Sequence, residues 1–208
     1  SSLRILPSIE VNTPESVEEV LAAISGVHEE QILISGIWAA GKSVRVLDGI
    51  CIVQELEEGN VFAISMEHLA QGEVCSALQS LFDMSKGVIG HNIKALIREM
   101  LAQGIYINNI YLDTQIAAYL INPAEASYSV NELASRYADV AFAASEEISD
   151  GQLDLSGSSS LPWQSAAEEG ILCGMLSQPL SEALEKQGLS DLNQTIEMKQ
   201  SYDGRLGT

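Results

Sequence analysis

The stretch from Gly90 to Pro123, GHNIKALIREMLAQGIYINNIYLDTQIAAYLINP, constrains the fold more than the rest of the chain. A short apolar run at 87–89 precedes it and predicts a strand. Apolar residues at helical spacing predict a helix over 91–103, followed by a short strand at 110–112. Asp113 is well placed to cap the next helix, and Pro123 is expected to end that helix. Alternating short strands and helices of this kind indicate an α/β domain.

The N-terminal part predicts one helix and three consecutive strands. Thr13 precedes a proline and is the expected cap of a helix whose apolar residues run from Val17 to Ile24. The apolar runs at 31–38, 45–55 and 61–65 are separated by short turns. Three strands joined in this way form an antiparallel meander. Together with the shorter strands it predicts a mixed sheet flanked by helices.

The C-terminal part is less regular. A short helix is expected over 130–137, and the Ser-, Gly- and Asp-rich run at 139–162 predicts a mobile loop. Helical spacing resumes near Trp163, and Pro179 should kink or interrupt that helix.

Bulk properties exclude several classes of protein. No apolar run approaches the roughly 20 residues of a membrane helix, and the N-terminus lacks the features of a signal peptide, so we expect a cytoplasmic protein with no membrane contact. Cys51, Cys75 and Cys173 are far apart and odd in number, which argues against disulfides and a thiolate zinc site. The chain carries 29 acidic and 10 basic residues, a net charge of -19. It should therefore bind DNA weakly or not at all by itself.

Several motifs in a fixed order resemble one family. They are GHNIKAL, DTQIAAYLINP, SYSVNELASRY and, near the C-terminus, Ile196-Glu197-Met198. Over residues 8–198 the chain resembles the DnaQ-like 3′–5′ exonuclease domain of bacterial DNA polymerase I (family A), which has a ribonuclease-H-like fold. On this reading, residues 1–7 are a linker and residues 199–208 a tail toward a polymerase region absent from this sequence.

The resemblance also implies where catalytic acids should stand. Such exonucleases use two divalent ions held by carboxylates to activate water and stabilise the leaving oxygen. Ser35 and Ile37 occupy the places of the first-strand Asp-x-Glu pair. Leu96 falls on the second aspartate, and the best match to the final Tyr-x-x-x-Asp motif gives Ser165 and Glu169. Only one of four acids then remains, and one carboxylate cannot hold two magnesium ions.

The resemblance therefore predicts a non-catalytic exonuclease-like domain without metal or cofactor of its own. Its partner would be the polymerase region of the same parent chain, a Mg²⁺-dependent enzyme of DNA replication and repair that holds the DNA. A residual metal-dependent 3′–5′ exonuclease using Glu169 and nearby acids such as Asp48 is one alternative. An acidic interaction module is another.

Three further features have a simpler structural interpretation. Asp113 matches a structural position of the family, and N-capping accounts for it better than metal binding. His91 should stabilise a turn. The string GIWAAGKS, ending in Lys42-Ser43, formally matches a phosphate loop. However, a strand rather than a helix is expected after it, so nucleotide binding is the least favoured alternative.

Overall fold

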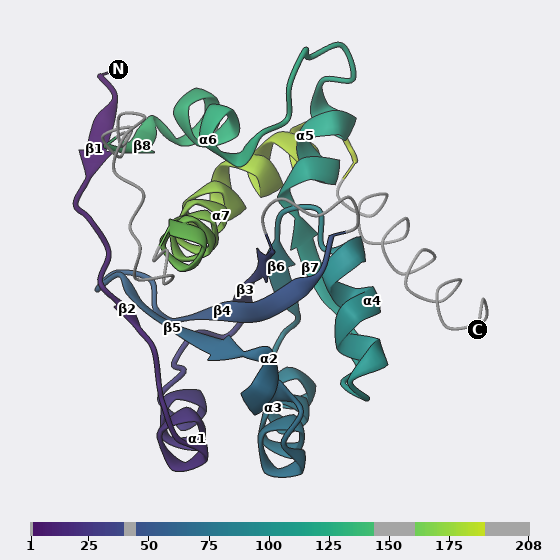
Figure 1. The fold of residues 1–208 in the computed structure, drawn as a ribbon. Helices are drawn as coiled ribbons and strands as arrows, with labels where there is room; N and C mark the ends of the chain where they lie inside the picture. The colour runs from purple at the N-terminus through teal and green to yellow at the C-terminus, as the bar shows by residue number, and fades with distance from the viewer. Residues whose placement is uncertain (1, 40–44, 144–160, 190–208) are drawn as a thin grey trace.

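The computed structural model describes residues 2–39, 45–143 and 161–189. A six-stranded mixed sheet lies at the centre, with helices on both faces (Figure 1). The strands, in chain order, are β1 (Arg4–Leu6), β2 (Val11–Asn12), β3 (Ile32–Trp38), β4 (Leu47–Glu55), β5 (Asn60–Ser65), β6 (Val88–Gly90), β7 (Ile110–Asp113) and β8 (Val140–Phe142). The helices are α1 (Val17–Ser25), α2 (Met66–Leu69), α3 (Gly72–Met84), α4 (Lys94–Ala102), α5 (Thr114–Ile121), α6 (Val130–Leu133), the π-helical turn η1 (Ala134–Ala138) and α7 (Leu161–Lys186).

The predicted meander forms the middle of the sheet. Its order is β2-β5-β4-β3-β6-β7, with β3, β4 and β5 antiparallel to their neighbours in the meander and β2, β6 and β7 added in parallel. This arrangement confirms the expected ribonuclease-H-like α/β class with a mixed sheet.

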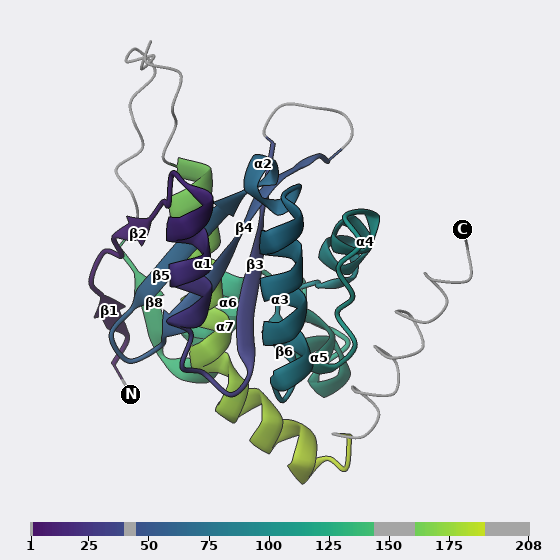
Figure 2. The same cartoon turned by 90° about the horizontal axis from the view of Figure 1, so that it is seen from below.

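Alternation of side chains along the central strands builds two cores. Ile32 and Ile34 of β3 point to the face covered by α1 and α3, which lie side by side in Figure 2. Leu33 and Ile37 point to the opposite face, where α7 crosses the sheet. The result is a three-layer domain, and none of its described helices is long and apolar enough to span a membrane.

The start of α1 differs from the prediction. Ser16, not Thr13, caps the helix, and its Oγ accepts a hydrogen bond from the Glu19 amide at 3.2 Å. The Glu19 carboxylate in turn accepts from the Glu15 amide at 2.8 Å. A Ser-x-x-Glu pattern satisfies two amides at once, which outweighs the preference of the Thr-Pro pair for a helix start.

Two segments expected to be irregular contain strands instead. Residues 4–6, assigned to the linker, form β1, and residues 140–142, assigned to the mobile loop, form β8. They pair in parallel as a separate two-stranded sheet. Each strand has only three residues, too few to show periodicity, and the partner lies far away in the chain. The rest of the predicted loop at 144–160, and the tail after Leu189 with its Ile-Glu-Met motif, lie outside the described residues.

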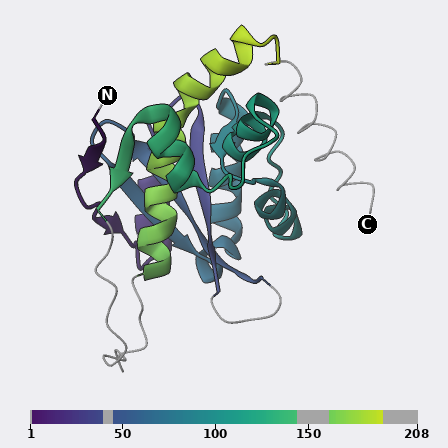
Figure 3. The same cartoon turned by 90° about the horizontal axis from the view of Figure 1, so that it is seen from above.

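Helix α7 runs through Pro179 without a break. The second half of the helix nevertheless changes direction relative to the first, as Figure 3 shows. A proline inside a helix removes one hydrogen bond and pushes the preceding turn away, so bending is expected there. The kink was predicted and an interruption does not occur.

The buried carboxylate of Asp113 joins two helix starts. It accepts hydrogen bonds from the Gln115 and Ile116 amides of α5 at 2.9 and 3.2 Å. It also accepts from the Asn92 and Ile93 amides before α4, at 3.1 and 2.8 Å. The expected capping role is therefore confirmed and extended. Because Asn92 has a φ of 54°, α4 starts at residue 94 and not at residue 91.

Replacing Asp113 by alanine should lower the free energy of unfolding by at least about 3 kcal/mol, because four backbone amides lose their acceptor. Asn, which keeps one acceptor oxygen, should cost less. Urea unfolding of both variants, with Asp48→Ala on the exposed side of β4 as the control, measures this. Equal stability of Asp113→Ala and the control would contradict the role of this carboxylate.

Candidate functional site

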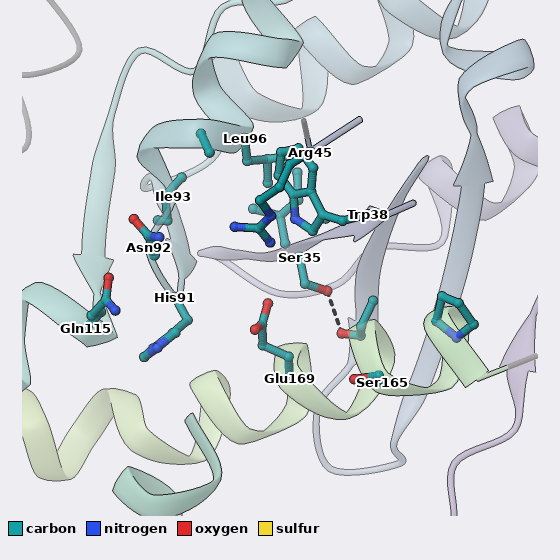
Figure 4. Close-up of a pocket in the computed structure, with 15 residues that line it drawn as sticks. Ser35, Trp38, Arg45, His91, Asn92, Ile93, Leu96, Gln115, Ser165 and Glu169 are labelled. Atoms are coloured by element: carbon teal, nitrogen blue, oxygen red, sulfur yellow. Dashed lines mark hydrogen bonds between the residues drawn. The ribbon is translucent and has the colours of Figure 1, made fainter. Parts of the chain in front are cut away.

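A cavity of about 340 Å³ opens between β3, the start of β4, the turn before α4, and α7 (Figure 4). Its size is near the lower end of small-molecule pockets, roughly 300 Å³. The residues around it come from all three layers of the domain and are Ile34, Ser35, Gly36, Trp38, Arg45, His91, Asn92, Ile93, Ala95, Leu96, Gln115, Pro162, Ser165, Ala166 and Glu169.

Four of the five predicted positions meet at this cavity. Ser35, Leu96, Ser165 and Glu169 line it, although they come from β3, α4 and α7. Ile37 does not line it. Its side chain is buried on the α7 side of the sheet, two residues along from Ser35.

Ser35 is held in a structural contact. The side chain is buried, and its Oγ donates a hydrogen bond to the carbonyl oxygen of Ala166 in α7 (Figure 4). Helix α7 can approach β3 this closely because small residues face the sheet. At Gly170 a Cβ atom would lie 3.7 Å from Ser35 Oγ of β3 and 3.3 Å from Val53 Cγ2 of β4. Strand and helix are thus tied together where the cavity ends.

Leu96 also has a packing role. It is 4% exposed and belongs to the core beneath α4, together with Met100. The same side chain therefore closes one side of the cavity with apolar atoms. A leucine there offers no ligand to a cation.

Glu169 is the one acidic residue among the described residues that line the cavity. Burial raises the pKa of its carboxyl to about 7; the Arg45 guanidinium opposes this shift and the Asp113 carboxylate adds to it. Near neutral pH the group is therefore present in both protonation states. In its neutral form it is a hydrogen-bond donor as well as an acceptor.

Sequence reasoning missed Arg45. Its guanidinium carbon lies 4.5 Å from the centroid of the Trp38 ring, a cation–π contact. Figure 4 shows both side chains above the cavity, on the side opposite Glu169. The scarcity of basic residues in this acidic chain was the available signal, but the segment was interpreted only as the start of a strand.

His91 has the structural role that was expected. Its Nδ1 lies 2.8 Å from Thr114 Oγ1, which links the turn before α4 to α5. Burial lowers the pKa of the His91 imidazole, and the Asp113 carboxylate works against that shift. The neighbouring carboxamides of Asn92 and Gln115, which the prediction did not include, add polar groups to the same wall.

The described side chains that line the cavity do not fit a pair of divalent ions. Within residues 2–39, 45–143 and 161–189, no three His, Cys, Asp or Glu side chains are grouped so that they could hold a metal ion. Mg²⁺ demands several oxygen ligands in near-octahedral geometry. Glu169 alone cannot supply them.

The phosphate-loop interpretation lacks its structural context. Strand β3 is followed by β4, which runs antiparallel to it, whereas a phosphate loop opens a helix. Lys42 itself lies outside the described residues.

Comparison with known proteins places this domain in a family. Residues 38–169, more than half of the chain, match the model of the DNA polymerase A 3′–5′ exonuclease. The chain belongs to this 3′–5′ exonuclease family. The match includes Leu96 and Ser165 and ends at Glu169. No curated protein matches the chain by sequence.

Solved structures show the same fold at low identity. A Pol1 from M. smegmatis, in complex with DNA primer-template and dNTP, aligns with a TM-score of 0.65 and 18% identity over 89% of this chain. The exonuclease-like chain covers only 29% of that polymerase chain. NrnC from Brucella melitensis, with bound Mg²⁺, aligns with a TM-score of 0.66 and 16% identity. The alignment covers 96% of this chain and 93% of the NrnC chain. The catalytic core of RRP6 from Trypanosoma brucei aligns with a TM-score of 0.68 and 14% identity. The alignment covers 96% of this chain and 54% of the RRP6 chain.

The raised pKa of Glu169 should make stability depend on pH. Between about pH 4.5 and 7 the folded state binds more protons than the unfolded state, so this group lowers stability as pH rises. Glu169→Gln removes the effect. The free energy of unfolding of Glu169→Gln minus that of wild type should therefore increase by up to about 3 kcal/mol as the pH rises through that window.

Urea unfolding of Glu169→Gln and wild type at several pH values measures this difference. Glu185→Gln, an exposed position on the same helix, is the matched control and should show no such trend. A difference between Glu169→Gln and wild type that stays constant with pH would contradict the burial of an ionisable carboxyl.

Ser35→Asp should destabilise the domain by about 3 kcal/mol, because a buried carboxylate would face the Ala166 carbonyl in place of a donor. Ser165→Asp, the same change at an exposed position on the cavity rim, should have little effect. Thermal unfolding of wild type and the two variants measures these changes in stability. Similar melting temperatures would show that the Ser35 contact contributes little.

Proposed function

We propose that this chain is the exonuclease-like domain of a DNA polymerase I and that it has no 3′–5′ nuclease activity. One observation carries the proposal. The positions that the family resemblance gives to three of the four metal-binding acids hold Ser35, Ile37 and Leu96. Each of these side chains is buried, and each is committed to a hydrogen bond or to core packing.

Charge supports the absence of metal chemistry. Two divalent ions bring four positive charges, which need several carboxylates and water-accessible oxygen ligands around them. The cavity instead places the Arg45 guanidinium opposite Glu169, the one carboxylate among the described residues that line it, and this cation partly offsets the carboxylate charge. Burial of that carboxyl further favours its neutral form.

The parent chain would perform DNA-templated DNA synthesis in replication and repair, in the cytoplasm. Support comes from the M. smegmatis polymerase, in which a region of this fold forms a minor part of a chain bound to primer-template and dNTP. Mg²⁺ would serve the polymerase region. The present domain would be a structural platform beside it and, with a net charge of -19, would bind DNA weakly or not at all on its own.

We expect no shortening of a 5′-labelled single-stranded oligonucleotide by this domain with either Mg²⁺ or Mn²⁺. The matched control is Glu169→Ala purified in the same way, and wild type and variant should be indistinguishable. Metal-dependent shortening that is lost in Glu169→Ala would instead establish the residual nuclease. Activity that is equal in both proteins would come from a contaminating enzyme and would agree with the proposal.

A further inference from the structure

Strand β1 forms an open edge of the small two-stranded sheet. It pairs with β8 on one side, and among the described residues no strand pairs with its other side. Figures 1 and 3 show β1 at the periphery of the domain. The Arg4 amide donates to the Asp139 carbonyl at 2.8 Å. Because alternate residues of a strand bond to the same neighbour, the N–H and C=O of Ile5 point away from β8 and are placed to pair with a further strand.

The outer face of this small sheet is apolar. Leu3 and Ile5 are 47% and 56% exposed, whereas Leu6 and Val140 on the opposite face are buried in the core that α7 covers. Ile5 lies beside Ala141 in the register of the two strands, so no charged side chain interrupts the face at that point. Exposed apolar side chains next to unpaired backbone groups are the features that strand addition uses.

The size of this edge selects the kind of partner. β1 has three residues and is therefore roughly 10 Å long. A stable complex between separate proteins buries about 800 Å² on each partner, which is more than so short a strand offers. A segment of the same chain needs less contact, because tethering gives it an effective concentration of about millimolar. Two copies of this chain, each with a net charge of -19, would in addition repel one another.

We propose that the outer edge of β1 binds an extended segment of the polymerase region of the parent chain, as a third strand of the small sheet. The inference rests on the proposed function, which supplies that region. Apolar side chains at alternate positions of the segment would cover Leu3 and Ile5. Its other residues would be neutral or basic, because the domain is strongly acidic.

Hydrogen exchange of the Ile5 amide, compared between this chain alone and the full parent chain, tests the proposal. Exchange should be at least about tenfold slower in the parent chain, because the amide gains a hydrogen-bond partner there. Gly72, at the exposed start of α3 on the other side of the main sheet, is the reference and should exchange equally in both proteins. Equal exchange of Ile5 in both would overturn the proposal. So would protection in this chain alone that rises with its concentration, because that result indicates a second copy.

Ile5→Lys should abolish the protection of the amide at position 5 in the parent chain, because a charge on an edge strand opposes further pairing. Folding of this chain alone should be unaffected, since the side chain is more than half exposed. Leu3→Lys, next to the strand, is a second variant with the same expected effect. The matched control is Val46→Lys, an exposed apolar position just before β4, which should keep the protection. Protection that survives both Ile5→Lys and Leu3→Lys would refute the apolar contact.

Photo-cross-linking from position 5 in the parent chain identifies the bound segment. A cross-link to the polymerase region supports the proposal, and a cross-link to any other region overturns it. Primer extension by the same preparation separates the two proposals. Missing protection in a parent chain that extends primers would overturn only the role of β1. A parent chain without polymerase activity would overturn the proposed function, and this inference with it.

Discussion

The Asp113 carboxylate is the interaction on which the arrangement around the cavity depends. It lies at the end of β7, is almost fully buried, and accepts four backbone hydrogen bonds from the starts of α4 and α5. Helix starts carry unpaired amides and a partial positive charge. The Asp113 carboxylate accepts hydrogen bonds from amides of both helices and offsets the charge at both starts. The turn at His91 and Asn92 is fixed as a result, and this turn places Leu96 on one side of the cavity.

Close contact between α7 and the sheet fixes the other side. A Cβ atom at Gly174 would lie 2.9 Å from Leu33 Cδ1 of β3, so a larger side chain there would require Leu33 to move. The Ser35 hydroxyl then reaches the Ala166 carbonyl, and Glu169 is brought under the cavity with little water around it. Tight packing and the unusual protonation of Glu169 therefore have the same origin.

Several polar side chains around the cavity have structural partners. Ser35 bonds to the backbone, Asp113 caps helices, and His91 bonds to Thr114. Arg45 differs, because its guanidinium lies over the Trp38 ring and forms no salt bridge among the described residues.

The sequence alone determined the central meander, the helices after β6 and β7, and the capping role of Asp113, because each depends on local spacing or on one residue at a helix start. Four of the five candidate residues, identified through motif order, line the same cavity. Tertiary structure alone decided the pairing of β1 with β8 and the place of Arg45 above the Trp38 ring. It also set the protonation of Glu169, because the pKa of a carboxyl depends on burial and on charges from distant segments, which no local pattern encodes.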